Sequence, residues 1–180
     1  MKKSVLYSLA TLILASFVLM SVSVSAQAGM TDEHIARIKS NCQEALGTLS
    51  LIHANDAPMY INRNQTYFSI SDKLMARLNS RLTLNRFDAT ELVKVASEYN
   101  ETLAKFRSAY KQYDDTMSEV IRIDCRRQPV SFYDKVAETR EQRAKVNEAV
   151  VRLKSLIDQY RDGVNAFKIQ HMKEFTGAGV

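Results

Sequence analysis

The sequence predicts an all-α fold, and three observations lead to this class. Apolar side chains recur at intervals of three and four residues over long stretches, as they do along one face of a helix. The 180 residues include only five glycines and two prolines, too few for the many turns of a β-rich protein. Hydrophobic residues make up 46% of the chain and charged residues 25%, which is typical of a folded domain and not of a disordered chain.

The first residues have the three regions of a secretory signal peptide. Lys2 and Lys3 form a basic start, residues 5–20 are mostly apolar, and small residues follow as far as Ala26. We expect residues 1–26 to be a signal peptide and residues 27–31 a linker. The alternative is an uncleaved N-terminal anchor, because an apolar run of about 20 residues can cross a bilayer. Either case predicts an extracytoplasmic protein (periplasmic, secreted or at the cell surface), with membrane contact only through residues 4–24 if they are retained.

The first helix is expected to begin at Asp32, because Thr31, Asp32 and Glu33 place a capping hydroxyl and two acids at the positive end of the helix dipole. Its apolar stripe continues to about Leu84. The stripe consists of Ile35, Ile38, Cys42, Leu46 and Leu49, followed after Pro58 by Tyr60, Tyr67, Ile70, Leu74 and Leu78.

Two further helices follow, and their apolar rhythm is that of a coiled coil. Asp88-Ala89-Thr90-Glu91 is a capping-box pattern and predicts the start of the second helix, which ends near Ile123. Pro129 is well placed in the first turn of the third. The domain is expected to span residues 32–172 and to end in a flexible tail over residues 173–180, where glycines occur.

Pro58 leaves two topologies open, because a proline can begin a new helix or bend an existing one. In the favoured topology, residues 32–84 form one helix kinked near Pro58, and the fold is an elongated antiparallel bundle of three long helices. In the alternative, the chain folds back at Pro58 into a four-helix up-down bundle. Burial favours this alternative, since a continuous first helix would overhang the others and leave Ile35 and Ile38 poorly covered.

The two cysteines favour the three-helix topology. An exported chain with two cysteines is expected to pair them. If the turn at residues 85–88 is the centre of a hairpin, Cys42 lies roughly 9 Å along the helix from the level of Cys125, whereas a fold-back at Pro58 separates them by on the order of 35 Å. We therefore predict a Cys42–Cys125 disulfide, with a small buried thiol at Cys42 and an unpaired Cys125 as the alternative.

Polar residues interrupt the apolar stripes of two helices at one level. Asp56 is expected opposite Met117, and Tyr60 opposite Tyr113. A buried arginine needs a carboxylate partner, and Asp56 is the candidate partner for Arg143 or for Arg63. Three interpretations stay open: a charged layer that sets helix register, a small-ligand pocket, and arginines that extend to solvent. The predicted polar core layer contains His53, Asp56, Arg63, Tyr110, Tyr113, Thr139 and Arg143.

The sequence contains no motif typical of catalysis or of cofactor binding. It has no Cys-x-x-Cys pair, no Gly-rich phosphate loop, no Gly-x-Ser-x-Gly elbow and no Glu-x-x-His, so we expect no catalytic residues, no cofactor and no metal ion. The acidic cluster of Asp114, Asp115 and Glu119 is interpreted as a solvated helix face. The formal net charge of +5 is not concentrated in a basic tail, and no nucleic-acid partner is expected.

The chain resembles uncharacterised exported helical-bundle proteins of reduced-genome bacteria, over roughly residues 35 to 170; that resemblance implies no activity. It depends on the spacing of Asn41, Cys42, Asp56, Arg63, Tyr67, Asn85, Asp88, Tyr99, Tyr110, Tyr113, Asp124, Cys125, Pro129, Phe132 and Tyr133. We expect a non-enzymatic structural or protein-interaction module of the cell envelope, acting on a protein partner or by self-association. The alternative is an extracytoplasmic helical bundle that binds or senses a small ligand.

Overall fold

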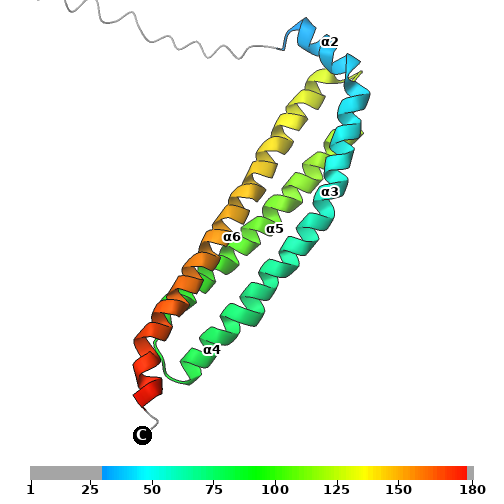
Figure 1. The fold of residues 1–180 in the computed structure, drawn as a ribbon. Coiled ribbons are helices and arrows are strands. Elements are labelled where there is room, and N and C mark those ends of the chain that lie inside the picture. The colour runs from blue at the N-terminus through cyan, green and yellow to red at the C-terminus, as the bar shows by residue number, and fades with distance from the viewer. Residues whose placement is uncertain (1–29, 178–180) are drawn as a thin grey trace, which may run out of the picture. The chain divides into compact units, whose positions relative to one another are not determined.

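The computed structural model describes residues 30–177, and side chains as far as Met172; residues from Asp32 onwards belong to one compact unit. The described part of the chain is all-α, as the sequence predicts, and has no strand (Figure 1). Its elements are α2 (Asp32–Ser40), α3 (Cys42–Ser69), the π-helical segment η1 (Ile70–Ala76), α4 (Arg77–Leu84), α5 (Thr90–Arg122) and α6 (Pro129–Gly177).

Several predicted features lie partly or wholly outside the described residues. The expected signal peptide or anchor and most of the linker fall within residues 1–29, and the last part of the expected tail is residues 178–180. The helix α6 continues past the predicted domain boundary at residue 172 and ends at Gly177. Among the helices that the structure describes, none has the length and apolar character needed to span a bilayer.

The chain does not reverse at Pro58, which lies inside α3. A proline cannot donate a hydrogen bond to the carbonyl of the residue four positions earlier, here Ala54. Both residues are exposed, so water can satisfy that carbonyl. The α-helix continues through Pro58, where the sequence predicts a kink, and it departs from α-helical hydrogen bonding at Asn41, between α2 and α3, and in η1.

The separate helix α2 partly buries its own Ile35 and Ile38, which a continuous first helix would leave poorly covered. The turn at Asn41 sets α2 off from α3, and α2 contacts α6 (Figure 1). Ile35 and Ile38 are both half-buried, and Ile38 packs against the cluster that contains Cys42, Val120 and Phe132. The predicted overhang is therefore avoided by a bend one residue before Cys42.

The predicted disulfide is confirmed. Cys42 at the start of α3 is joined to Cys125 in the loop between α5 and α6, with a Cα–Cα distance of 5.6 Å, and both residues are almost fully buried. The loop is shaped by Asp124, whose Oδ1 accepts hydrogen bonds from the backbone N–H groups of Arg126 (3.0 Å) and Arg127 (3.2 Å). The end of the bundle opposite the disulfide is closed by the turn before α5, where Asp88 Oδ1 accepts the N–H of Thr90 at 3.0 Å. The N-cap of α5 is Ala89, one residue after the predicted Asp88, and it makes no side-chain capping bond, so the predicted capping box is not formed.

The middle helix of the fold is α5, which packs along α6 and along α3 and η1. Its predicted stripe is the core: among its buried residues are Tyr99, Phe106, Tyr113 and Val120. The largest cluster lies towards the α4–α5 turn and joins α5 to Met75 and Leu82 on one side and to residues of α6 on the other. In that half of the bundle, apolar side chains fill the space between the three chain segments.

Tyrosines of α5 and α6 bind the backbone around the π-helical segment. The hydroxyl of Tyr99 donates to the carbonyl of Tyr67 at 3.1 Å, just before η1. The hydroxyl of Tyr160 lies 2.7 Å from Asn79 Oδ1 and 3.3 Å from the carbonyl of Met75, within hydrogen-bonding distance of both. A π-helix interrupts the regular α-helical ladder, so hydroxyls from neighbouring helices can satisfy carbonyls there.

The helices pair with an offset from the predicted register. Asp56 contacts Tyr113 rather than Met117, and Tyr60 contacts Tyr110 rather than Tyr113. In both pairs the α5 residue lies about one helical turn closer to the loop between α4 and α5 than the sequence predicts. A π-helix closes its hydrogen bonds over five residues instead of four and so needs more residues to cover the same length. The segment η1 contributes to the offset for this reason.

Candidate binding groove

Two adjoining cavities lie between α3 and α6, and residues of α5 line the bottom of both. The first, which we call the arginine cavity, has a volume of about 480 Å³; its walls carry Arg63, Arg140 and Arg143, and its floor includes Phe106 and Tyr110. The second, which we call the apolar cavity, has a volume of about 580 Å³ and lies towards the disulfide. Its apolar lining residues include Ile38, Leu49, Ile52, Met117, Val120, Phe132 and Val136. The two cavities share Tyr113, Arg140 and Arg143, and together they form what we call the α3–α6 groove.

The groove exists because α3 and α6 each pack against α5 but make few direct contacts with each other. Near the α4–α5 turn, large buried side chains such as Tyr67, Met75 and Tyr160 fill the space between the helices. Towards the disulfide, α6 presents Val136, Thr139 and Arg143 to the same space, and the first two are too short to fill it. In this part of the bundle, α3, α5 and α6 therefore leave an open gap that Ile38 of α2 lines but does not fill.

Asp56 connects the three helices where the two cavities meet. Its Oδ2 accepts a hydrogen bond from the hydroxyl of Tyr113 on α5 (2.6 Å) and forms an ion pair with Nη2 of Arg143 on α6 (3.0 Å). The Asp56 side chain is 13% exposed and that of Arg143 is 54% exposed, so the carboxylate is buried while the guanidinium reaches solvent. Burial, together with the hydrogen bond to Asp56, raises the pKa of Tyr113 well above that of a free tyrosine.

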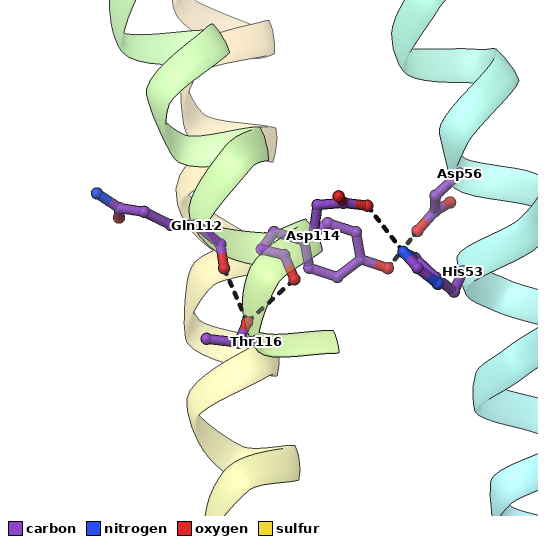
Figure 2. Close-up of polar contacts among 6 residues, drawn as sticks. His53, Asp56, Gln112, Asp114 and Thr116 are labelled. Atoms are coloured by element: carbon purple, nitrogen blue, oxygen red, sulfur yellow. Dashed lines mark hydrogen bonds and ion pairs between the residues drawn. The ribbon is translucent and has the colours of Figure 1, made fainter. Parts of the chain in front are cut away.

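His53 forms a separate contact one turn from Asp56. Its Nε2 lies 2.7 Å from Oδ1 of Asp114, and Figure 2 shows both His53 and Asp56 reaching from α3 towards α5. The ring and the carboxylate are partly exposed, with side-chain exposures of 26% and 42%. This contact joins α3 to α5 but is separate from the network of Asp56, Tyr113 and Arg143.

Tyr60 and Tyr110 stack face to face in the arginine cavity. Their ring centroids are 3.7 Å apart and the ring planes differ by 5°. Tyr110 is 9% exposed, and within the described part of the chain its hydroxyl is a buried polar group with no hydrogen-bond partner. Burial raises the pKa of Tyr110 to about 12, and the nearby carboxylates of Asp114 and Asp56 act in the same direction.

The predicted polar layer is divided among these contacts. Of the two arginines that the sequence offers as partners of Asp56, the structure pairs it with Arg143, and Tyr113 belongs to the same network. Arg63 lies exposed on the wall of the arginine cavity and extends to solvent, one of the three interpretations left open. The buried Thr139 hydroxyl donates to the carbonyl of Lys135 in its own helix (2.8 Å) and takes no part in the layer.

Three residues are missed by the sequence reasoning about the polar layer: Arg140 and Tyr60, which line the groove, and Asp114, which does not. Asp114, assigned to a solvated face, is the partner of His53. Arg140 lies three positions before Arg143 and so on the same face of α6, a signal that could have identified it. Tyr60 is recognised as a stripe residue, but nothing in the sequence indicates that its ring stacks on Tyr110.

The groove has the features of a binding surface. Its lining side chains are aromatic and aliphatic, with guanidinium groups at the centre, and within residues 30–177 no cluster of His, Cys, Asp and Glu side chains is suited to a metal ion.

Comparisons of the chain with models of protein families, with curated proteins and with solved structures find no match.

Proposed function

We propose that the protein is an exported, non-enzymatic helical module of the cell envelope that binds a protein partner in the α3–α6 groove. The observation that carries this proposal is the gap between α3 and α6, where two adjoining cavities are lined by side chains of α3, α5 and α6 together with Ile38 of α2. An amphipathic helix is the element that fills such a space, since it presents one apolar face to a groove between helices.

Export is supported by the composition of residues 1–26 and by the disulfide. The basic, apolar and small-residue regions of that segment match a signal peptide. Disulfides persist in oxidising compartments outside the cytoplasm and are rare inside it. The Cys42–Cys125 bond is therefore consistent with a protein that folds after export.

The side chains of the groove favour an acidic partner helix. Met59 and Tyr133 line it while remaining 44% and 53% exposed, so a helix in the groove would remove apolar surface from water. Asp56 is already paired with Arg143, which leaves Arg63 and Arg140 without an acidic partner in the described part of the chain. A partner helix with carboxylates beside its apolar face would complement both features.

Filling the groove tests the proposal. Thr48 and Ser50 are both exposed small residues of α3, but only Thr48 lines the apolar cavity. We expect the wild-type protein, extracted from the envelope of the cells that produce it, to migrate on a native gel as a complex with a second protein. Thr48→Trp should release the monomer, whereas the control Ser50→Trp should keep the complex.

Two results would contradict the proposal. One is a wild-type protein that is extracted as a monomer, and the other is a complex that persists in Thr48→Trp. If mass spectrometry of the complex shows two identical chains, the occupant is a second copy and the acidic partner helix is wrong. Equal melting temperatures of the two tryptophan variants would show that neither substitution acts by unfolding the bundle.

A small-ligand function is the second candidate, and one observation favours it. Beside the arginine cavity, with its exposed guanidinium groups, lies the buried hydroxyl of Tyr110, which has no hydrogen-bond partner among the described residues. Buried polar groups are nearly always hydrogen-bonded, so such a group next to a cavity suggests a bound molecule.

A further inference from the structure

We propose that the arginine cavity binds a small organic anion that joins a carboxylate to a planar aromatic ring. The inference does not need the partner helix to exist, but it uses Arg63 and Arg140 of the same groove, so an anionic ligand and an acidic partner helix would compete for the arginine cavity. It names the class of ligand for the small-ligand candidate.

The charge of the cavity favours an anion. Three of its lining residues are arginines and one is an aspartate. The carboxylate of Asp56 already accepts the Tyr113 hydroxyl and pairs with Arg143, so its negative charge is compensated within the protein. Arg63 and Arg140 remain, and their planar guanidinium groups suit the geometry of a carboxylate.

The aromatic side chains of the cavity favour a ring. The ring of Tyr60 stacks on that of Tyr110 with a distance of 3.7 Å between ring centroids, and the ring centroid of Phe106 lies 5.4 Å from that of Tyr60. Tyr60 is half-buried, so part of its ring stays accessible from the cavity. A flat ligand can add to this stack, and the volume of about 480 Å³ is within the range of about 300–1,000 Å³ typical of small-molecule sites.

The Tyr110 hydroxyl supplies the observation that points to a ligand. Tyr110 is 91% buried, and its hydroxyl has no hydrogen-bond acceptor among the described residues. Because that oxygen is covered, a ligand reaches it only by displacing a side chain of the cavity wall. Arg63 and Arg140 are exposed and form no ion pair within the described chain, so displacing either side chain breaks no salt bridge. A carboxylate held by them then accepts a hydrogen bond from the Tyr110 hydroxyl, which stays protonated.

Three small probes separate the parts of the proposal. Benzoate has both the ring and the charge, benzamide has the ring without the charge, and acetate has the charge without the ring. In calorimetric titrations of the purified protein at low salt, we expect benzoate to bind at least tenfold more tightly than either of the others. Equal affinities for benzoate and benzamide would overturn the anion site, and equal affinities for benzoate and acetate would overturn the aromatic part.

Variants locate the binding. Arg140→Gln should weaken benzoate binding at least fivefold, while Arg81→Gln, an exposed arginine of α4 outside the groove, should not change it. Tyr110→Phe removes only the hydroxyl and should also weaken benzoate binding, with no loss of melting temperature, because that hydroxyl has no partner to lose. If Arg140→Gln and Tyr110→Phe both bind benzoate as the wild type does, the proposal is wrong.

The outcome of the benzoate titration does not depend on whether a partner helix binds the groove. The titration uses the isolated protein, so a failure to bind benzoate leaves the native-gel prediction for Thr48→Trp untouched. A positive titration together with a wild-type protein that is always monomeric would instead favour the small-ligand function over the protein-partner function.

Discussion

The carboxylate of Asp56 accepts a 2.6 Å hydrogen bond from the hydroxyl of Tyr113, and this contact ties α3 to α5 at the centre of the groove. Arg143 of α6 approaches the same carboxylate, so the three helices meet at one buried charge. Removing that charge leaves the Tyr113 hydroxyl without its acceptor. The stability of the bundle and the shape of the groove therefore depend on the same residue.

The first prediction concerns this network. Asp56→Ala should lower the free energy of unfolding by about 2 kcal/mol, because the lost hydrogen bond is to a charged group and is largely buried. Arg143→Ala should cost less than about 1 kcal/mol, since its guanidinium is 54% exposed and screened by solvent. The loss in the free energy of unfolding of the double variant should be smaller than the sum of the two single losses by about 0.5 kcal/mol or more.

Urea unfolding followed by circular dichroism measures these losses. Asp134→Ala is the control, because Asp134 is exposed on α6 and has no partner in the described structure. Strictly additive losses from Asp56→Ala and Arg143→Ala would show that the two residues are not coupled, and the shared network would have to be abandoned.

The second prediction concerns the disulfide. The two cysteines are 83 positions apart, so the bond restricts a long loop of the unfolded chain. Replacing both cysteines by serine should lower the free energy of unfolding by about 4 kcal/mol. A reducing agent should destabilise the wild type by a similar amount and leave the double variant unchanged. A wild type whose unfolding midpoint does not respond to the reductant would contradict the prediction.

The third prediction concerns alkaline pH. Burial raises the pKa of Tyr110 and of Tyr160 to about 12, and the pKa of Tyr99 and of Tyr113 is raised further. A tyrosine in the unfolded chain has a pKa of about 10. A raised pKa in the folded state favours the neutral phenol, so this stabilisation is complete below pH about 10 and is lost as the pH rises towards about 12.

Absorbance of tyrosinate and circular dichroism, recorded across this range, test the alkaline prediction. We expect the ionisation of the buried tyrosines and the loss of helix to occur together between pH about 10 and 12. If every tyrosine ionises near pH 10 while the helix content stays constant, the assignment of these groups to a tight core is wrong.

The fourth prediction concerns the π-helical segment. Tyr99→Phe and Tyr160→Phe each remove a hydroxyl that binds beside or within the segment Ile70–Ala76, and each should lower the free energy of unfolding by about 0.5–1.5 kcal/mol. Amide hydrogen exchange in that segment should become faster. Tyr133→Phe, which alters a 53% exposed ring, is the control. Exchange that is unchanged in both core variants would contradict a stabilising role for these hydroxyls.

The fold class, the disulfide and the helix ends near Asp88 and Pro129 could be predicted from the sequence, because they follow from local patterns. Apolar periodicity sets the stripe of α5, and the pattern at Asp88 predicts the start of that helix to within two residues of Thr90, although Ala89 and not Asp88 is its N-cap. The distance argument for Cys42 and Cys125 succeeded because an error of one turn still leaves the sulfurs within reach of a flexible loop.

The site could be predicted only in part, because it depends on register. The π-helix η1 has no clear signature in the sequence, and it contributes to moving Asp56 from Met117 to Tyr113. That displacement brings a hydroxyl, rather than a thioether, against the carboxylate. The groove itself follows from the absence of close packing between α3 and α6, a tertiary property that the pattern of either helix alone does not contain.

The account depends most directly on the groove being the surface that meets the partner. Ile52 lines the apolar cavity, and its neighbour Leu51 is 63% exposed and does not line either cavity. A photo-reactive phenylalanine analogue placed at each position in turn, in cells that produce the protein, should give a cross-link to a second protein only from position 52. Cross-links of equal yield from both positions, or from position 51 alone, would contradict the proposed groove.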